Sequence, residues 1–174
     1  MPLKTNSDEQ SYTLRDGTVI YVRLQSKADE QHLKNAFGKL SATSKRLRYF
    51  SISNALSDND WEHYLNIDNT NRAAVVAYKK ENEEIFGIGV ARYFRTEDSS
   101  EVAEAGITVI DEFHHKGIGK ILLSHLAAHA KENGITAFRA EIHSSNTSML
   151  NMLRNLPHTV AKLEDNILRL EYGI

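Results

Sequence analysis

The sequence predicts an α/β domain of the α+β kind, in which helices flank a mixed, largely antiparallel central sheet. Three observations support this class. An Asp-Gly pair joins two β-rich segments near the N-terminus, several apolar runs of strand length follow in the middle, and one long amphipathic helix separates these runs from further strands. The 174 residues are 41% hydrophobic and 25% charged, which is typical of one soluble domain with a sizeable core.

The N-terminal part is expected to form a hairpin and three helices. Residues 1–10 are polar and we expect them to be disordered, so the single domain is predicted over residues 11–174. Asp16-Gly17 is typical of a turn between strands at 12–14 and 19–22. The helices are expected over residues 29–37, from Ser41 or Thr43 to Tyr49, and from Ser57 to Leu65.

Strands dominate the rest of the chain. Apolar runs at 73–78, 85–94 and 102–110 indicate three strands, the second interrupted by Gly87 and Gly89, which we interpret as a site of close packing. Residues 117–133 predict the longest helix, because apolar residues recur on one face at helical spacing: Ile118, Ile121, Leu122, Leu126 and Ala130. The remaining elements are a strand at 137–142, a short helix at 147–155 and a hairpin of 159–163 with 167–172.

Composition excludes several function classes. The 21 basic and 23 acidic residues give a net charge of −2, which argues against a nucleic-acid partner. The chain has no cysteine, hence no disulfide and no cysteine nucleophile. We expect no membrane partner and a cytoplasmic location, because no apolar run could span a bilayer and the N-terminus lacks a signal-peptide core. His125 and His129 lie four residues apart, but Leu126 replaces the glutamate of a zinc-protease helix, so no metal is predicted.

The segment from Glu104 to Lys120 carries the most chemical information. A strand ends in a short loop, and Gly117 and Gly119 then open the long helix. Glycines let the backbone approach a ligand, and the free N–H groups of residues 116–120 would converge at the positive end of the helix dipole. We interpret this as an anion site suited to a pyrophosphate. The alternative is a helix start that uses glycine only for a tight connection.

Residues 114–119, His-His-Lys-Gly-Ile-Gly, resemble the acetyl-CoA-binding motif of the GCN5-related N-acetyltransferases, Gln/Arg-x-x-Gly-x-Gly/Ala. Both glycines match, whereas His114 replaces the usual Gln or Arg and His115 a frequent glycine. The order of elements from about residue 12 onward is also similar to this family. Further segments resemble the catalytic domain of bacterial Pat-type protein lysine acetyltransferases: residues 40–44 with 48–50, then 71–77, 87–93 and 103–105.

This resemblance implies an acetyl-CoA-dependent N-acetyltransferase that acts on a primary amine, preferably a protein lysine. Glu104 matches the family's catalytic glutamate and is expected to act as general base for direct attack, its pKa raised by burial among apolar neighbours. The resemblance assigns cofactor binding to the following residues: Ile107, Thr108, Val109, His114, His115, Lys116, Gly117, Ile118, Gly119, Lys120 and Asn146. Asn146 is also suited to cap the short helix that follows it.

Alternatives remain open at this point. Leu153 stands where many relatives have a tyrosine as general acid, which leaves the proton donor for the thiolate unassigned. The acceptor could be a small-molecule amine or the N-terminus of a ribosomal protein, or the chain could be a non-catalytic acyl-CoA-binding regulatory domain. The expected partners are acetyl-CoA and the acceptor, with the protein as a monomer or homodimer. Lys45, Arg46 and Arg48 form a basic cluster that we interpret as a solvated helix face, with an acidic substrate surface as the alternative.

Overall fold

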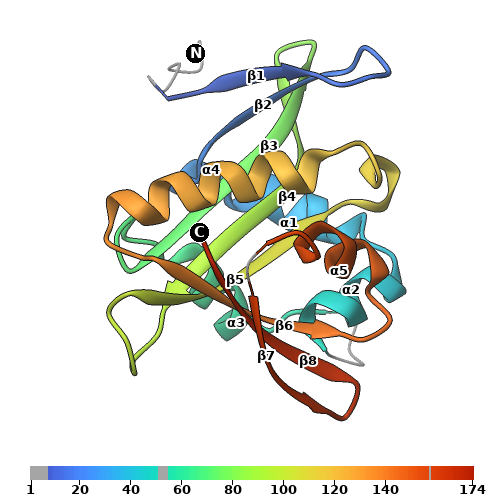
Figure 1. Cartoon of the computed structure of the whole chain (residues 1–174). Helices are drawn as coiled ribbons and strands as arrows, with labels where there is room; N and C mark the ends of the chain where they lie inside the picture. The colour runs from blue at the N-terminus through green and yellow to red at the C-terminus, as the bar shows by residue number, and fades with distance from the viewer. Residues whose placement is uncertain (1–7, 51–54, 157) are drawn as a thin grey trace.

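The Asp16-Gly17 turn joins the first two strands of a mixed sheet, which has eight strands in the described part of the chain. Figure 1 shows this sheet in the computed structural model of the chain. The structure describes residues 8–50, 55–156 and 158–174. The strand order is β1-β2-β3-β4-β5-β6-β8-β7, and every neighbouring pair is antiparallel except β5 with β6. The strands are β1 (Gln10–Thr13), β2 (Val19–Leu24), β3 (Arg72–Glu81), β4 (Glu84–Arg95), β5 (Val102–Val109), β6 (Ala137–His143), β7 (His158–Glu164) and β8 (Ile167–Gly173). The predicted fold class is confirmed.

In the described part of the chain, five α-helices and two short 3-10 helices connect these strands. They are η1 (Lys27–Asp29), α1 (Glu30–Gly38), α2 (Ala42–Tyr49), α3 (Asp58–Leu65), η2 (Asp111–Phe113), α4 (Ile118–Glu132) and α5 (Thr147–Leu153). Of the two candidate caps for α2, Ser41 is the one used, since its side chain accepts a hydrogen bond from the N–H of Ser44. Strand β1 begins at Gln10, the last residue of the segment expected to be disordered, and residues 1–7 lie outside the described part.

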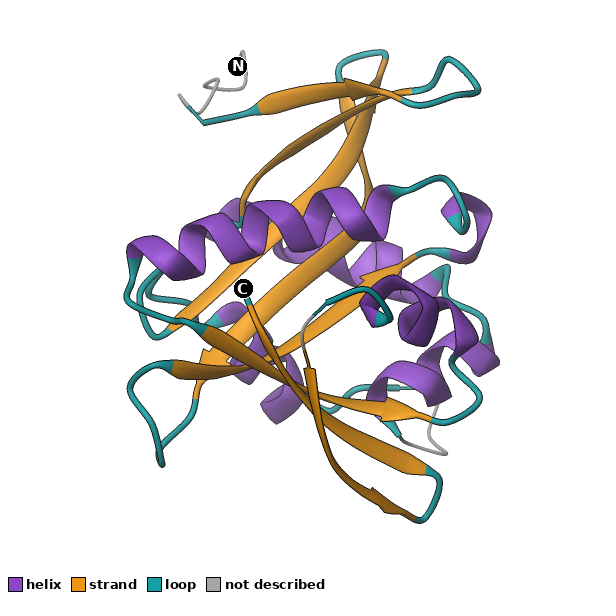
Figure 2. Ribbon diagram, viewed as in Figure 1, coloured by secondary structure: helices purple, strands orange, loops and turns teal. Residues whose placement is uncertain are grey.

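Helices cover both faces of the sheet (Figure 2). On one face α4 buries Ile118, Leu122, Leu126 and Ala130 against the larger hydrophobic cluster, and Ile121 packs at its margin, as the helical spacing predicts. On the other face α1 and α3 cover a smaller cluster, which joins Leu33 of α1 to side chains of β3 and β4: Ala74, Val76, Tyr78 and Val90, with Trp61 and Leu65 packed against them.

Strands β5 and β6 pair over only part of their length. Their parallel ladder joins Val102–Glu104 to Ala137–Arg139 and then ends, while β5 continues to Val109 along its other neighbour, β4. From Ala105 onward the edge of β5 that faces β6 has no strand partner in the described structure. Its backbone N–H and C=O groups are therefore available to a ligand, apart from the Val109 carbonyl oxygen, which accepts a hydrogen bond from the His114 side chain.

The two glycines of β4 mark close backbone contacts, as the sequence indicates. A Cβ at Gly87 would lie 2.9 Å from the carbonyl oxygen of His32 in α1. A Cβ at Gly89 would lie 2.8 Å from the carbonyl oxygen of Thr108 in β5. Glycine at these positions lets α1 and β5 approach β4.

We expect Gly89→Ala to lower the free energy of unfolding by about 1–3 kcal/mol, because the new methyl group must push apart two paired strands. Gly38→Ala is the matched control. No atom lies within 4 Å of a Cβ at Gly38, so the control should be neutral or slightly stabilising. Urea unfolding of both variants measures the difference, and equal stabilities would show that the β4–β5 contact relaxes without cost.

Candidate active site

A groove of about 980 Å³ opens where β5 ends and α4 begins. All eleven residues predicted to bind the cofactor line it. Three further elements complete its walls: the β1–β2 turn, α2 and α5. These walls also contain residues that were not predicted from the sequence to contact the cofactor. They include Leu14, Arg15, Asp16, Ser41, Thr43, Ser44, Leu47, Arg48, Met149 and Met152.

The start of α4 forms one end of the groove. Gly117 is its N-cap with φ 84°, and no side chain caps the helix. The N–H groups of residues 118–120 therefore lack helical carbonyl partners and point out of the positive end of the dipole. A Cβ at Gly119 would make an ordinary van der Waals contact, at 3.5 Å, with the Met152 sulfur of α5. This backbone arrangement fits a phosphate group.

Two side chains expected to contact the cofactor have partners within the protein instead. The Lys116 ammonium pairs with the Asp16 carboxylate at 2.7 Å, and its hydrogen bond holds the pKa of Asp16 well below its usual range. The His114 Nε2 lies 2.8 Å from the carbonyl oxygen of Val109, which accepts, so this nitrogen carries the proton. At this end of the groove the donors left without a partner are therefore mainly backbone N–H groups of the start of α4.

The opposite wall combines the unpaired edge of β5 with the start of α5. Ile107, Thr108 and Val109 line the groove along this edge. Asn146 is the N-cap of α5, where its side-chain oxygen accepts a hydrogen bond from the N–H of Met149 at 3.2 Å. The capping role of Asn146 is confirmed, and its position on the groove wall leaves the side-chain amide near a ligand.

Glu104 lies at the last ladder pair of β5 and β6, where the two strands begin to separate. Its side chain is exposed, so the predicted burial among apolar neighbours is wrong. Successive side chains of a strand point to opposite faces. Ala103 and Ala105 therefore face the larger cluster, while Glu104 points to the other face of the sheet. Glu104 does not line the groove but stands just beyond its inner end.

Leu153 is 2% exposed and belongs to the hydrophobic core, so it supplies no proton donor. His125 and His129 have separate partners: His125 Nε2 lies 2.6 Å from the Tyr12 hydroxyl, and His129 Nε2 lies 2.8 Å from the Asn69 carbonyl oxygen. Among the described residues no group of three or more histidine or acidic side chains could hold a metal ion. Within the same residues no helix has the length and apolar character needed to cross a bilayer.

The sequence of residues 41–156 matches the profile of the acetyltransferase (GNAT) family. This range includes α2, the β4–β5 ladder, the start of α4 with Gly117 and Gly119, and α5. The chain belongs to this family. The GNAT domain of PAT from S. lividans is similar over nearly the whole domain, with 28% identity, 95% of this chain and 97% of that chain covered, and a TM-score of 0.82.

Two further proteins are similar to this chain at lower sequence identity. Acetyltransferase PA5475 of Pseudomonas aeruginosa is 23% identical over 137 residues, which span 79% of this chain and 73% of that protein. YncA of Salmonella typhimurium, whose structure contains its cofactor acetyl-CoA, is 19% identical with a TM-score of 0.66, over 88% of this chain and 91% of that chain. The YncA comparison shows a shared fold.

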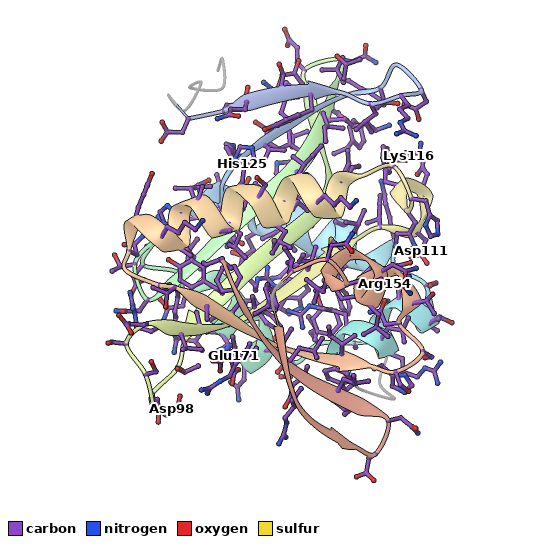
Figure 3. The ribbon with its side chains drawn as sticks, viewed as in Figure 1. Asp98, Asp111, Lys116, His125, Arg154 and Glu171 are labelled. Atoms are coloured by element: carbon purple, nitrogen blue, oxygen red, sulfur yellow. The ribbon has the colours of Figure 1, made fainter. Side chains whose placement is uncertain are left out.

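In the GNAT domain of this chain, Asp111 forms hydrogen bonds that connect the N-terminal end of α2 to the loop that leads to α4. Its carboxylate accepts hydrogen bonds from the Ser41 N–H at 2.9 Å, the Ser41 hydroxyl at 2.6 Å and the Ser44 hydroxyl at 2.8 Å. Burial alone would raise the pKa of Asp111, but these donors outweigh it and hold the pKa below its usual value. Figure 3 shows Asp111 and Lys116 together at the end of the molecule where α4 begins. Asp111, Ser41 and Ser44 all line the groove. The hydrogen bonds between Asp111 and the two serines therefore fix the distance between the α2 wall and the wall formed by the loop before α4.

We expect Asp111→Asn to weaken acetyl-CoA binding by a few-fold and to lower the free energy of unfolding by about 1–2 kcal/mol, because an amide oxygen cannot replace a carboxylate that accepts three hydrogen bonds. Titration calorimetry and urea unfolding measure the two effects. Glu112→Gln, at the exposed neighbouring position, is the control and should change neither. Equal behaviour of the two variants would show that α2 is held in place without Asp111.

Proposed function

We propose that this GNAT domain transfers an acetyl group from acetyl-CoA to a primary amine, preferably the side chain of a protein lysine. The observation that carries the proposal is the continuity of the groove. It runs from the N-terminus of α4 along the unpaired edge of β5 toward Glu104, at the point where β5 and β6 separate.

The groups along the groove match the successive parts of acetyl-CoA, first its pyrophosphate, then its pantetheine arm and then its thioester. The N–H groups of Gly117, Ile118, Gly119 and Lys120 would hold the pyrophosphate at the helix dipole, with the His115 and Lys120 side chains nearby. The edge formed by Ile107, Thr108 and Val109 would hydrogen-bond the amides of the pantetheine arm as an added strand does. The thioester supplies the activated acetyl group, and a backbone N–H of β5 would polarise its carbonyl.

Glu104 is the proposed general base. A lysine amine has a reference pKa near 10.4, so the attacking amine must lose a proton before or during attack. Glu104 accepts this proton and passes it to solvent, which the exposure of its side chain permits. Because Leu153 is buried and apolar, water in the open groove protonates the leaving thiolate.

The acceptor class is tested with two sets of amines. Acetylation of lysine-containing peptides and proteins, and of free amino acids, polyamines and peptides with a free α-amine, is followed by mass spectrometry with acetyl-CoA as donor. The proposal predicts turnover on internal lysines. Turnover on small amines alone would replace the lysine assignment. Binding of acetyl-CoA without turnover on any amine would favour a regulatory acyl-CoA-binding domain.

A further inference from the structure

Two arginines share the sheet face onto which Glu104 points. On β4, Arg92 pairs across the ladder with Gly106, and Phe94 pairs with Glu104. The guanidinium of Arg48, from α2, fills the space above Gly106, since a Cβ at that position would collide with it. Arg92 and Glu104 therefore lie two ladder positions apart on one face of the β4–β5 ladder, and the Arg48 guanidinium lies over Gly106 on the same face.

Neither arginine has an acidic partner among the described residues, and the Nε atoms of both are buried without a hydrogen-bond partner. Arg92 is only 3% exposed. Burial, together with the positive charge of Arg48, lowers the pKa of Arg92 to about 10, so it stays cationic at neutral pH. The buried Arg23 differs, because it forms a two-point ion pair with Asp29. Arg92 also hydrogen-bonds the Tyr49 side chain, but the Nε atoms of both arginines stay without a partner. Two neighbouring cations with such buried donors are costly unless an anion joins them.

Aromatic rings surround the two guanidinium groups. The Arg92 Cζ lies 4.5 Å from the centre of the Tyr64 ring, and the Arg48 Cζ lies 5.2 Å from the centre of the Tyr49 ring. Arg92 lines a cavity of about 40 Å³ beneath α1, while Arg48 lines the cofactor groove, and Thr108 borders both spaces. On this face of the sheet Arg48 thus borders the groove, and Arg92 lies next to it beneath α1.

We propose that Arg48 and Arg92 form a carboxylate-binding subsite for the acceptor, so that the favoured acceptor carries a carboxylate close to its reacting amine, as does a lysine with an acidic neighbour in a peptide. The proposal rests on the function proposed above. Gly106 and Glu104 are separated by about 7 Å along the strand, which is a suitable spacing for one molecule to place its carboxylate at the arginines and its amine at Glu104. Arginine is well suited to this role because its fork of donors matches a carboxylate.

The test compares pairs of lysine peptides that differ only in the flanking residue, Glu against Gln or Asp against Asn. The wild-type protein should show a kcat/KM about 10- to 100-fold higher for the acidic member of each pair. Arg48→Gln should reduce this ratio to about one, chiefly through KM. Arg46→Gln, at an exposed position of the same helix, should leave the ratio unchanged. A wild-type ratio near one, or a ratio that survives Arg48→Gln, would overturn the proposal.

A second variant and a binding measurement complete the test. Gly106→Ala displaces the Arg48 guanidinium while retaining its charge, so it should also lower the ratio. Calorimetric binding of acetyl-lysine product peptides to the CoA-bound protein needs no turnover. Tighter binding of acidic product peptides would support the subsite even if the proposed reaction failed, and equal or absent binding would overturn it. If free glutamate is acetylated in an Arg48-dependent way while the peptides are not, the carboxylate site stands and its ligand is a small amino acid.

Discussion

Glu104→Gln is expected to lower kcat for acetyl transfer by about 10²- to 10⁴-fold while the dissociation constant of acetyl-CoA stays unchanged. Glutamine keeps the size and polarity of the side chain but cannot accept a proton from the attacking amine. Binding should survive because Glu104 does not line the cofactor groove. Steady-state kinetics with a saturating acceptor and calorimetry with acetyl-CoA separate the two quantities.

Glu101→Gln is the matched control for this experiment. Glu101 is exposed and lies immediately before β5, three residues from Glu104, so both variants remove one carboxylate from the same segment. The control should retain wild-type kcat. Unchanged turnover in Glu104→Gln would remove Glu104 from the mechanism and leave deprotonation of the amine to solvent.

Asp29→Asn is expected to cause the largest loss of stability, about 3–5 kcal/mol in the free energy of unfolding. The Asp29 carboxylate receives two hydrogen bonds of 2.7 Å from the Arg23 guanidinium and one of 2.7 Å from the Ser26 N–H. The exposed fractions of the two side chains are 5% for Asp29 and 11% for Arg23. Asparagine would leave the Arg23 charge buried without a counter-ion at the junction of β2 and α1.

The pH dependence of the same pair has a defined sign. Burial alone would raise the pKa of Asp29, but Arg23 and the Ser26 donors outweigh it, so the folded-state pKa lies below the ordinary value of 3.8. The contribution of Asp29 to stability is therefore present above pH 3.8 and is lost as the pH falls through the folded-state pKa. In Asp29→Asn this acid-dependent loss should be absent from unfolding curves recorded at decreasing pH.

Glu30→Gln provides the control, because Glu30 forms an exposed ion pair with Lys34 at 2.7 Å on the surface of α1. Such pairs contribute about 0.3–0.5 kcal/mol. Urea unfolding should thus separate the two variants by several kcal/mol. A loss of less than about 1 kcal/mol in Asp29→Asn would show that water or another group compensates Arg23.

Local patterns in the sequence were sufficient to predict the order of the elements. Apolar periodicity marked α4, the Asp16-Gly17 pair marked the first hairpin, and serines marked the caps of α2 and α3. Each of these signals acts between residues close in sequence, where backbone geometry decides the outcome. The glycine-rich start of α4 was likewise marked by Gly117 and Gly119, which lie close together in the sequence motif and both line the groove.

The parts that the sequence did not predict depend on contacts between distant residues. Asp16 and Lys116 are 100 positions apart, and Ser41 and Asp111 are 70 positions apart, so no local pattern marks these contacts. The wrong prediction for Glu104 has a different cause. Its apolar neighbours in sequence point to the opposite face of β5, and alternation along a strand does not show which face is covered.

We expect the groove at the start of α4 to bind acetyl-CoA, and thermal unfolding of the protein with and without acetyl-CoA measures this binding. At about 100 times its dissociation constant the ligand should stabilise the fold by about 2.7 kcal/mol. For a domain of this size the expected rise in Tm is about 5–10 °C. We expect this rise with acetyl-CoA and with CoA but not with ATP. An unchanged Tm at millimolar acetyl-CoA would contradict it, because the cradle of Gly117 and Gly119 would then hold no cofactor.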